Sequence, residues 1–126
     1  NKDKFHWSNA AFNAIAFRTT DIVNAIKKDL KLDIHNISVD GGLSQCEYLM
    51  QLQANALQMN VNVVESESTC LGCAFIVGLA CGVYKNINEI KKLVNNQKTY
   101  LFKPDKYNKT KLLAWRRVIN HARKVH

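Results

Sequence analysis

The stretch I-S-V-D-G-G-L-S, residues 37–44, predicts a buried strand that turns through two glycines into a helix. β-branched residues favour the strand, and adjacent glycines permit backbone angles that a side chain would forbid. Ser44 and Glu47 have the spacing of a capping box, in which Ser44 caps the helix and Glu47 returns to the Ser44 amide. Gly41 and Gly42 therefore leave open backbone beside a helix N-terminus, where amide donors and the helix dipole favour a nucleotide. The alternative is that the glycines only turn a tight corner between strand and helix.

The rest of the chain predicts mostly helices, with one further short strand. Apolar residues recur at three- and four-residue steps, and Ser8 and Asn86 mark helix starts. The expected helices span about 9–30, 45–58, 69–82, 86–94 and 107–124, and the expected strands span about 34–39 and 61–64.

Two of the expected helices have apolar surface that other parts of the protein must bury. Helix 9–30 has an apolar face that we expect a sheet to bury, and its members include Ile15, Ile22 and Ile26. Helix 69–82 is apolar on every side and rich in small residues, which predicts a buried helix. Helix 107–124 is amphipathic, with Leu112, Trp115, Ile119 and Ala122 expected inward and Lys111, Arg116, Arg123 and Lys124 expected outward.

Length and hydropathy predict about one domain without a membrane span. The chain has 126 residues, and its most apolar stretch, residues 70–83, is shorter than the roughly 18 residues that a spanning helix needs. Four cysteines without a pairing pattern fit a reducing compartment. We therefore expect a cytoplasmic protein with no membrane partner.

The net charge of +8 is concentrated at the C-terminal end. Residues 1–84 hold 6 basic and 8 acidic residues, whereas the last 42 hold 12 and 2. A solvated, lysine-rich helical face explains this asymmetry, since the basic residues belong to no recognisable nucleic-acid-binding module. We expect no nucleic-acid partner.

A C-x-x-C pair formed by Cys70 and Cys73 is a weak metal signal. Cys46 and Cys81 are isolated and the four histidines are scattered, which does not match the common zinc spacings. We expect each cysteine to pack as a small hydrophobic residue and the chain to hold no metal.

Two parallel strands joined by a helix normally belong to a larger sheet that is covered on both faces. The first helix begins almost at the N-terminus and indicates a crossover whose preceding strands are missing. These observations predict the C-terminal piece of a larger α/β protein.

Several stretches carry a family resemblance along nearly the whole chain, in one order. They are A-F-N-A-I-A-F-R-T-T-D (11–21), V-D-G-G-L-S (39–44), L-M-Q-L-Q-A (49–54), T-C-L-G-C-A (69–74), G-L-A-C-G (78–82), F-K-P (102–104) and W-R-R-V (115–118). They resemble the C-terminal domain of the FGGY carbohydrate kinases, and most closely the glycerol-phosphorylating members.

This resemblance implies an actin-like ATPase fold, in which two ribonuclease-H-like domains close on a nucleotide. Residues 1–126 would form the C-terminal part of the second domain, with the first domain absent. The implied reaction transfers a phosphoryl group from ATP to glycerol, giving ADP and glycerol 3-phosphate, with Mg²⁺ bound by the full-length enzyme.

The same resemblance assigns the site residues. Gly41 and Gly42 inherit a contact with ATP or ADP near the adenine and the α-phosphate, and Cys46 stands where the family usually places an adenine-binding Asn. The catalytic Asp and the glycerol-binding residues of the family belong to the first domain. We therefore expect no catalytic residue in this chain and no activity from the chain alone.

Two further functions stay open. One is another FGGY sugar or polyol kinase, and the other is a non-catalytic nucleotide-binding or interaction module. An exposed sheet edge and uncovered apolar surface also predict that copies associate into a homo-oligomer.

Overall fold

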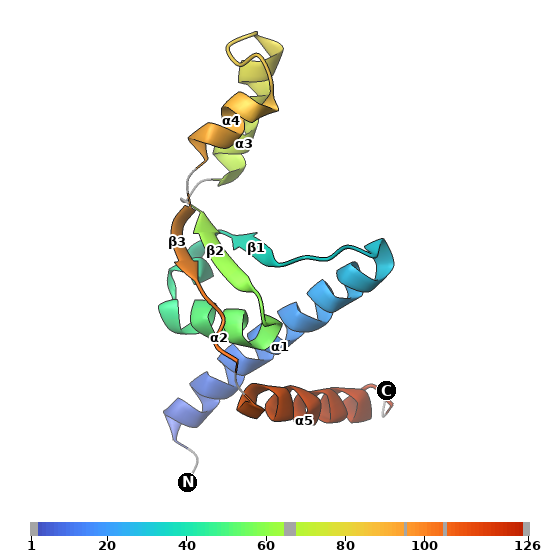
Figure 1. Ribbon diagram of the computed structural model, residues 1–126. Coiled ribbons are helices and arrows are strands. Elements are labelled where there is room, and N and C mark those ends of the chain that lie inside the picture. Colours follow the sequence, from blue (N-terminus) through green and yellow to red (C-terminus); the bar gives the residue numbers. More distant parts are fainter. Residues whose placement is uncertain (1–2, 65–67, 95, 105, 125–126) are drawn as a thin grey trace.

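The computed structural model describes residues 3–64, 68–94, 96–104 and 106–124 and shows a three-stranded sheet with helices packed on one face (Figure 1). This arrangement confirms the predicted α/β class. Its elements are α1 (Lys4–Leu30), β1 (Asn36–Val39), the 3-10 helix η1 (Gly42–Gln45), α2 (Glu47–Leu57), β2 (Asn60–Val64), α3 (Ser68–Ala80), α4 (Ile87–Leu93), β3 (Asn96–Tyr100) and α5 (Lys106–Ala122).

The sheet has the strand order β1-β2-β3. β1 and β2 are parallel, with Ile37 opposite Val61, and α2 connects them. β3 is antiparallel to β2 and was not predicted from the sequence, so the expectation of only two strands was wrong. Tyr100 of β3 is buried while Lys98 and Thr99 are exposed, and a strand with so little apolar alternation is hard to recognise.

The core lies on both sides of α2. One cluster joins α2 to the sheet and consists of Leu49, Met50, Ala54, Val61, Val63 and Tyr100. A second cluster of Ala16, Phe17 and Ala56 joins α2 to α1, with Leu112 and Trp115 of α5 packed against it. α2 is therefore the central helix, covered by the sheet on one side and by α1 and α5 on the other.

The opposite face of the sheet is polar. Ser38 and Thr99 are exposed, and Thr99 Oγ1 donates a hydrogen bond to Asn62 Oδ1 at 2.9 Å across β2 and β3. Among the residues that the structure describes, helices cover only one face of the sheet.

Helix α1 begins earlier than predicted. The Asp3 carboxylate accepts hydrogen bonds from the amides of Phe5 at 3.1 Å and His6 at 3.3 Å, which makes Asp3 the N-cap. Ser8, the predicted cap, lies inside the helix and donates from Oγ to the Lys4 carbonyl at 3.0 Å. A capping residue one turn upstream therefore decided where the helix begins.

The buried face of α1 also differs from the prediction. Ala16, Phe17 and Thr20 are buried, while Ile22 and Ile26 are about half exposed, at 49% and 42%. The reason is that α1 packs against α2 and α5 rather than against the sheet, so a narrower face is covered.

Helix α5 packs as predicted through Leu112 and Trp115, and the Trp115 ring lies 6.0 Å from that of Phe17. Two expectations for this helix fail. Arg116 does not point freely outward, because its Nε and Nη2 donate to Asp21 Oδ1 of α1 at 2.8 and 2.5 Å. Ala122 is exposed rather than inward.

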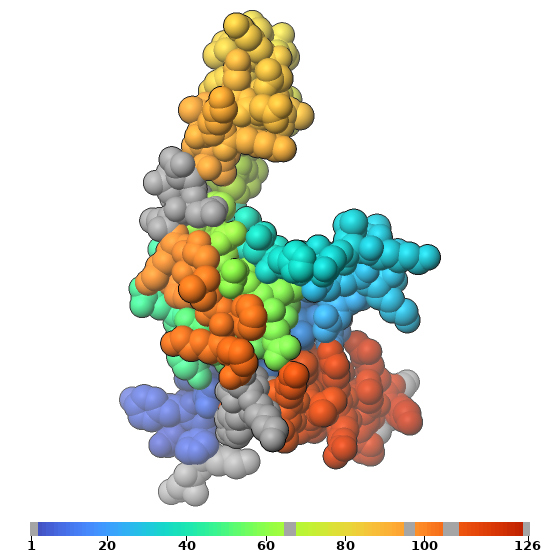
Figure 2. Space-filling view, viewed as in Figure 1, coloured from blue at the N-terminus to red at the C-terminus, as the bar shows by residue number. Residues whose placement is uncertain are grey.

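Helices α3 and α4, with the turn between them, form a unit that stands away from the sheet (Figures 1 and 2). We call residues 68–94 the α3–α4 unit. α3 was expected to be buried, yet only Gly78 of its 13 residues is buried, and Ile76 and Val77 expose 69% and 60% of their surface. The expectation was wrong for this chain because no described helix or strand lies along the outer face of α3.

The predicted start of α4 is confirmed, since Asn86 Oδ1 accepts hydrogen bonds from the amides of Asn88 at 2.9 Å and Glu89 at 3.2 Å.

Among the helices that the structure describes, none is long and apolar enough to cross a membrane.

Candidate nucleotide-binding turn

The two glycines follow the carboxyl end of β1 and differ in conformation. Gly41 has φ +89° and ψ 175°, a region that is essentially restricted to glycine. Gly42 begins η1 and has no positive φ. Only Gly41 is therefore required by the backbone of the turn.

Space around both glycines is open. A Cβ built on Gly41 or on Gly42 would meet no atom of the described residues within 4 Å. Gly42 is thus explained neither by its own conformation nor by a described neighbouring group. Open backbone outside the carboxyl end of a parallel strand is where α/β folds bind ligands.

The predicted capping box is absent, because a short 3-10 helix intervenes between the turn and α2. Ser44 is buried in η1 and donates from Oγ to the Gly41 carbonyl at 2.7 Å, while its amide donates to the same oxygen at 3.0 Å. Ser44 therefore holds the turn closed instead of capping α2.

Cys46 is the N-cap of α2 by position, but its side chain makes no capping hydrogen bond. The side chain is partly buried and packs against the cluster that contains Leu49. The structure thus places Gly41, Gly42 and Cys46 in one short segment, with Cys46 turned partly toward the core.

Glu47 opens α2 and pairs with Lys98 of β3 rather than with Ser44. The hydrogen bond from Lys98 to Glu47 raises the pKa of the ammonium group, and its Nζ also lies 5.0 Å from the centre of the Tyr100 ring. Beside this pair is a cavity of about 220 Å³ lined by Ser44, Gln45, Glu47, Val63, Lys98 and Tyr100. The start of α2 is therefore fixed to the far edge of the sheet.

Asp40 and Ser68 form a contact that the sequence did not predict. Ser68, at the start of α3, donates from Oγ to Asp40 Oδ2, directly before the glycine turn. The two residues are 28 positions apart, so no local pattern indicated Asp40 as the acceptor. This hydrogen bond ties the base of the α3–α4 unit to the turn.

Within the described ranges, no three His, Cys, Asp or Glu side chains come together as a metal-binding group. All four cysteines are free. Cys70, Cys73 and Cys81 are exposed rather than packed, because they lie on the α3–α4 unit, and only Cys46 packs as expected.

Comparisons with known proteins agree with this architecture. Residues 1–81 match the model of the FGGY family of carbohydrate kinases, C-terminal domain. The chain is 36% identical over 121 residues to a glycerol kinase of Mycoplasma genitalium, which covers 94% of this chain and 24% of the relative. The chain thus spans about a quarter of the length of the curated relatives it matches.

Two solved structures share the fold. The crystal structure of Plasmodium falciparum glycerol kinase with ADP superposes with a TM-score of 0.85 at 24% identity, covering 96% of this chain and 25% of that one. Gluconate kinase from Lactobacillus acidophilus superposes with a TM-score of 0.76 at 22% identity, covering 97% and 26%. At these identities the likeness concerns the fold alone.

Proposed function

Because the chain belongs to the FGGY family of carbohydrate kinases, we propose that it supplies the adenosine side of the nucleotide cleft of an ATP-dependent glycerol kinase. The reaction is the transfer of a phosphoryl group from ATP to glycerol, giving ADP and glycerol 3-phosphate. The chain corresponds to the C-terminal part of the second kinase domain. Identities of 34–38% to glycerol kinases over most of the chain support glycerol as the substrate.

The open backbone at Gly41 and Gly42 is the observation that carries this proposal. Gly41 makes the turn, and Gly42 leaves the space that a ligand needs, since a Cβ there would meet no atom in the part of the chain that the structure describes. The adenosine lies against Gly42, with the start of η1 beside it and Cys46 at the edge of the base. The residues present therefore fit the adenosine end of ATP.

Phosphoryl transfer requires groups that this chain is not proposed to supply. Mg²⁺ neutralises the charge that develops on the phosphates, and a carboxylate orients the attacking hydroxyl. We assign Mg²⁺ and the base to the remainder of the kinase, because the resemblance to the FGGY family places the catalytic Asp in the first domain. We accordingly expect the 126-residue chain alone to release no ADP in the presence of glycerol and ATP.

Cys46 supports the second candidate, a nucleotide-binding or interaction module without catalysis. A thiol is a weak hydrogen-bonding group, and this one packs partly against the core, so it selects adenine less well than an amide would. Another FGGY sugar kinase is a third candidate, for which the shared fold with gluconate kinase is the support.

Titration of the ¹⁵N-labelled chain with ADP, followed by amide NMR, tests the proposal. We expect saturable shifts at Gly41, Gly42 and Cys46, weak because half of the cleft is absent. Gly42→Ala should abolish them, whereas Cys46→Asn should strengthen binding by about 0.5–1.5 kcal/mol through a new hydrogen bond. Inorganic phosphate is the control ligand, because the basic α5 helix can attract any anion. Shifts confined to α5 and reproduced by phosphate would contradict the assignment.

A further inference from the structure

A polar cavity lies beside the glycine turn, at the carboxyl end of the parallel strands. Val63 is next to the last residue of β2, and it is paired with Lys98 of β3. Ligands bind in α/β folds outside this end of the parallel strands. The cavity has a volume of about 220 Å³ and is lined by Ser44, Gln45, Glu47, Val63, Lys98 and Tyr100. It therefore lies at the edge of the sheet where a ligand is expected.

Ser44 connects the cavity to the turn. Its Oγ and its amide donate hydrogen bonds to the Gly41 carbonyl at 2.7 and 3.0 Å, and the same residue lines the cavity. Gln45 and Glu47, which also line the cavity, are the neighbours of Cys46 in the chain. The cavity therefore adjoins the segment that we assign to adenosine.

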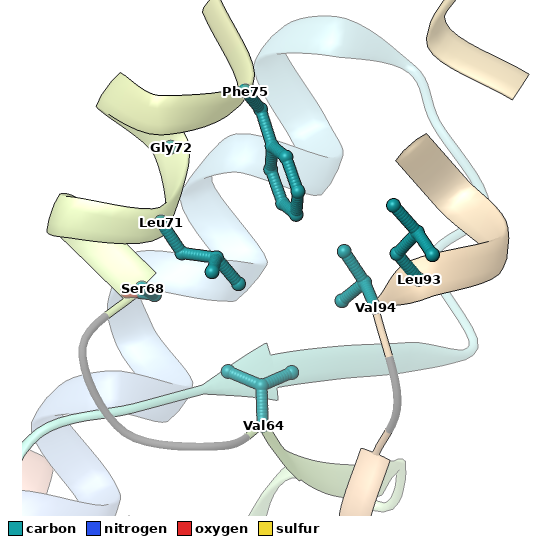
Figure 3. A pocket seen from close by; sticks show the side chains of 7 residues that line it. All are labelled: Val64, Ser68, Leu71, Gly72, Phe75, Leu93 and Val94. Atoms are coloured by element: carbon teal, nitrogen blue, oxygen red, sulfur yellow. The ribbon is translucent and has the colours of Figure 1, made fainter. Parts of the chain in front are cut away.

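The size of the cavity suits part of a ligand. Pockets that enclose a whole small molecule usually measure roughly 300–1,000 Å³, whereas this one can hold a base while the rest of a nucleotide lies over the turn. The cavity between α3 and α4 has the same volume, but Figure 3 shows mainly apolar side chains around it, among them Leu71, Phe75 and Leu93. The cavity beside the turn is instead lined by charged groups, which can select a base by hydrogen bonds.

Glu47 and Lys98 place a hydrogen-bond acceptor and a donor side by side. Lys98 Nζ donates to Glu47 Oε1, and the two side chains stay 50% (Lys98) and 73% (Glu47) exposed. An ammonium group has three donors and a carboxylate has about four acceptor sites, so both retain capacity for a ligand. An ion pair this exposed contributes little to stability. Stability alone therefore does not explain the pair.

Adenine carries an exocyclic amine that donates hydrogen bonds and a ring nitrogen beside it that accepts them. The thiol of Cys46 is weak in both roles. We propose that the cavity takes the base of an adenine nucleotide, with Glu47 accepting a hydrogen bond from the amine and Lys98 donating one to the ring nitrogen. This assignment rests on the proposed function, and it adds the residues that select the base.

A free anion is the other occupant to consider, because Lys98 and the positive end of the α2 dipole both attract negative charge. Glu47 opposes an anion, since its carboxylate lies in the first turn of α2 and pairs with Lys98. A neutral base with a donor amine meets no such repulsion. The charges around the cavity therefore favour the base over phosphate.

Titrations of the ¹⁵N-labelled chain with ADP and with inosine diphosphate (IDP), followed by amide NMR, test the proposal. IDP carries an oxygen where ADP carries the amine, so it offers Glu47 no donor at that position. Glu47→Gln is the test variant, since Gln has the size of Glu and can donate as well as accept. Asp29→Asn is the control, because it removes the same charge from an exposed position on α1.

We expect IDP to bind the unmodified chain and Asp29→Asn at least about fivefold more weakly than ADP, as one lost hydrogen bond implies. In Glu47→Gln the ratio of the two Kd values should fall below about twofold, because the new amide donates to the oxygen of IDP. Lys98→Met should weaken ADP binding about threefold or more relative to Lys92→Met, which removes an exposed lysine from α4.

Equal Kd ratios in Glu47→Gln and Asp29→Asn, or shifts at Glu47 and Lys98 that inorganic phosphate alone reproduces, would overturn the assignment of the base. If ADP still shifted Gly41 and Gly42 in that case, the proposed function would stand without it. ADP that shifts neither the turn nor the cavity would overturn both.

Discussion

The burial of apolar side chains differs between two regions of the molecule. The first region consists of residues 3–64 and 96–124, and the second is the α3–α4 unit. In the first region, which we call the body, Leu49 and Val61 expose 1% and 0% of their surface, and the uncovered face of the sheet is polar. In the α3–α4 unit only Gly78 and Ile90 are buried, and large apolar side chains such as Ile76 and Val77 are exposed. Apolar side chains therefore form a core in the body, whereas most of those in the unit are exposed.

A matched pair of leucine substitutions gives the largest expected difference between the two regions. Leu49→Ala leaves a cavity in the fully buried cluster and should lower the free energy of unfolding by about 2–5 kcal/mol. Leu71→Ala removes a side chain that is 44% exposed and should cost less than about 1 kcal/mol. Urea denaturation followed by circular dichroism measures both. Equal losses would mean that the α3–α4 unit contributes to the same core as the body.

The glycine turn follows Asp40, which accepts a hydrogen bond from Ser68 of the α3–α4 unit, and it provides the next contrast. Gly41→Ala places a Cβ at φ +89° and should reduce the free energy of unfolding by about 1–3 kcal/mol. Gly42→Ala should change it by less than about 0.5 kcal/mol, since neither its φ nor a neighbouring atom opposes the methyl group. The same denaturation experiment applies. A large loss from Gly42→Ala would show that this glycine serves the fold, which would remove its assignment to the ligand.

The smallest expected effect concerns the start of α1, far from the α3–α4 unit. The hydrogen bond with His6, followed by those from the backbone amides of His6 and Phe5, lowers the pKa of Asp3 below its ordinary 3.8. A lowered pKa means that the cap contributes stability above the ordinary value and loses it as the pH falls through the folded one. The amide shifts of Phe5 and His6 should therefore show a transition below about pH 4, where the Asp3 carboxylate is protonated.

Asp3→Asn is the control for this prediction, because an Asn side chain also caps helices but does not titrate in this range. Its amide shifts at Phe5 and His6 should stay constant over the same pH range. A transition that persists in Asp3→Asn would assign the titration to another group.

The sequence predicted the central helix well. The expected helix at about 45–58 is α2. Leu49, Gln53 and Ala56 are buried and Leu52 and Leu57 are partly buried, because a three- and four-residue spacing places them on one face whatever that face contacts. The sequence did not predict correctly which residues cap the helices α1 and α2. Asp3 rather than Ser8 caps α1, and Ser44 closes the turn instead of capping α2.

The sequence by itself determined the strand, the glycine turn and the helix at 36–57, together with the family to which they belong. The physical reason is that these features depend on neighbours within about one helical turn. β-branched residues favour the strand, glycine permits the backbone angles of the turn, and the spacing of apolar residues favours the helix.

Only the tertiary structure decided which surfaces are covered. Asp40 and Ser68 are 28 positions apart, and Asp21 and Arg116 are 95 apart, so no local pattern could pair them. β3 exists because β2 offers it a backbone partner, and α3 is exposed because no described element lies on it, although its composition alone predicts a buried helix. The period of apolar residues indicates which side chains share one face of a helix. Whether that face is buried depends on what packs against it, and the segments that pack together are distant in the sequence.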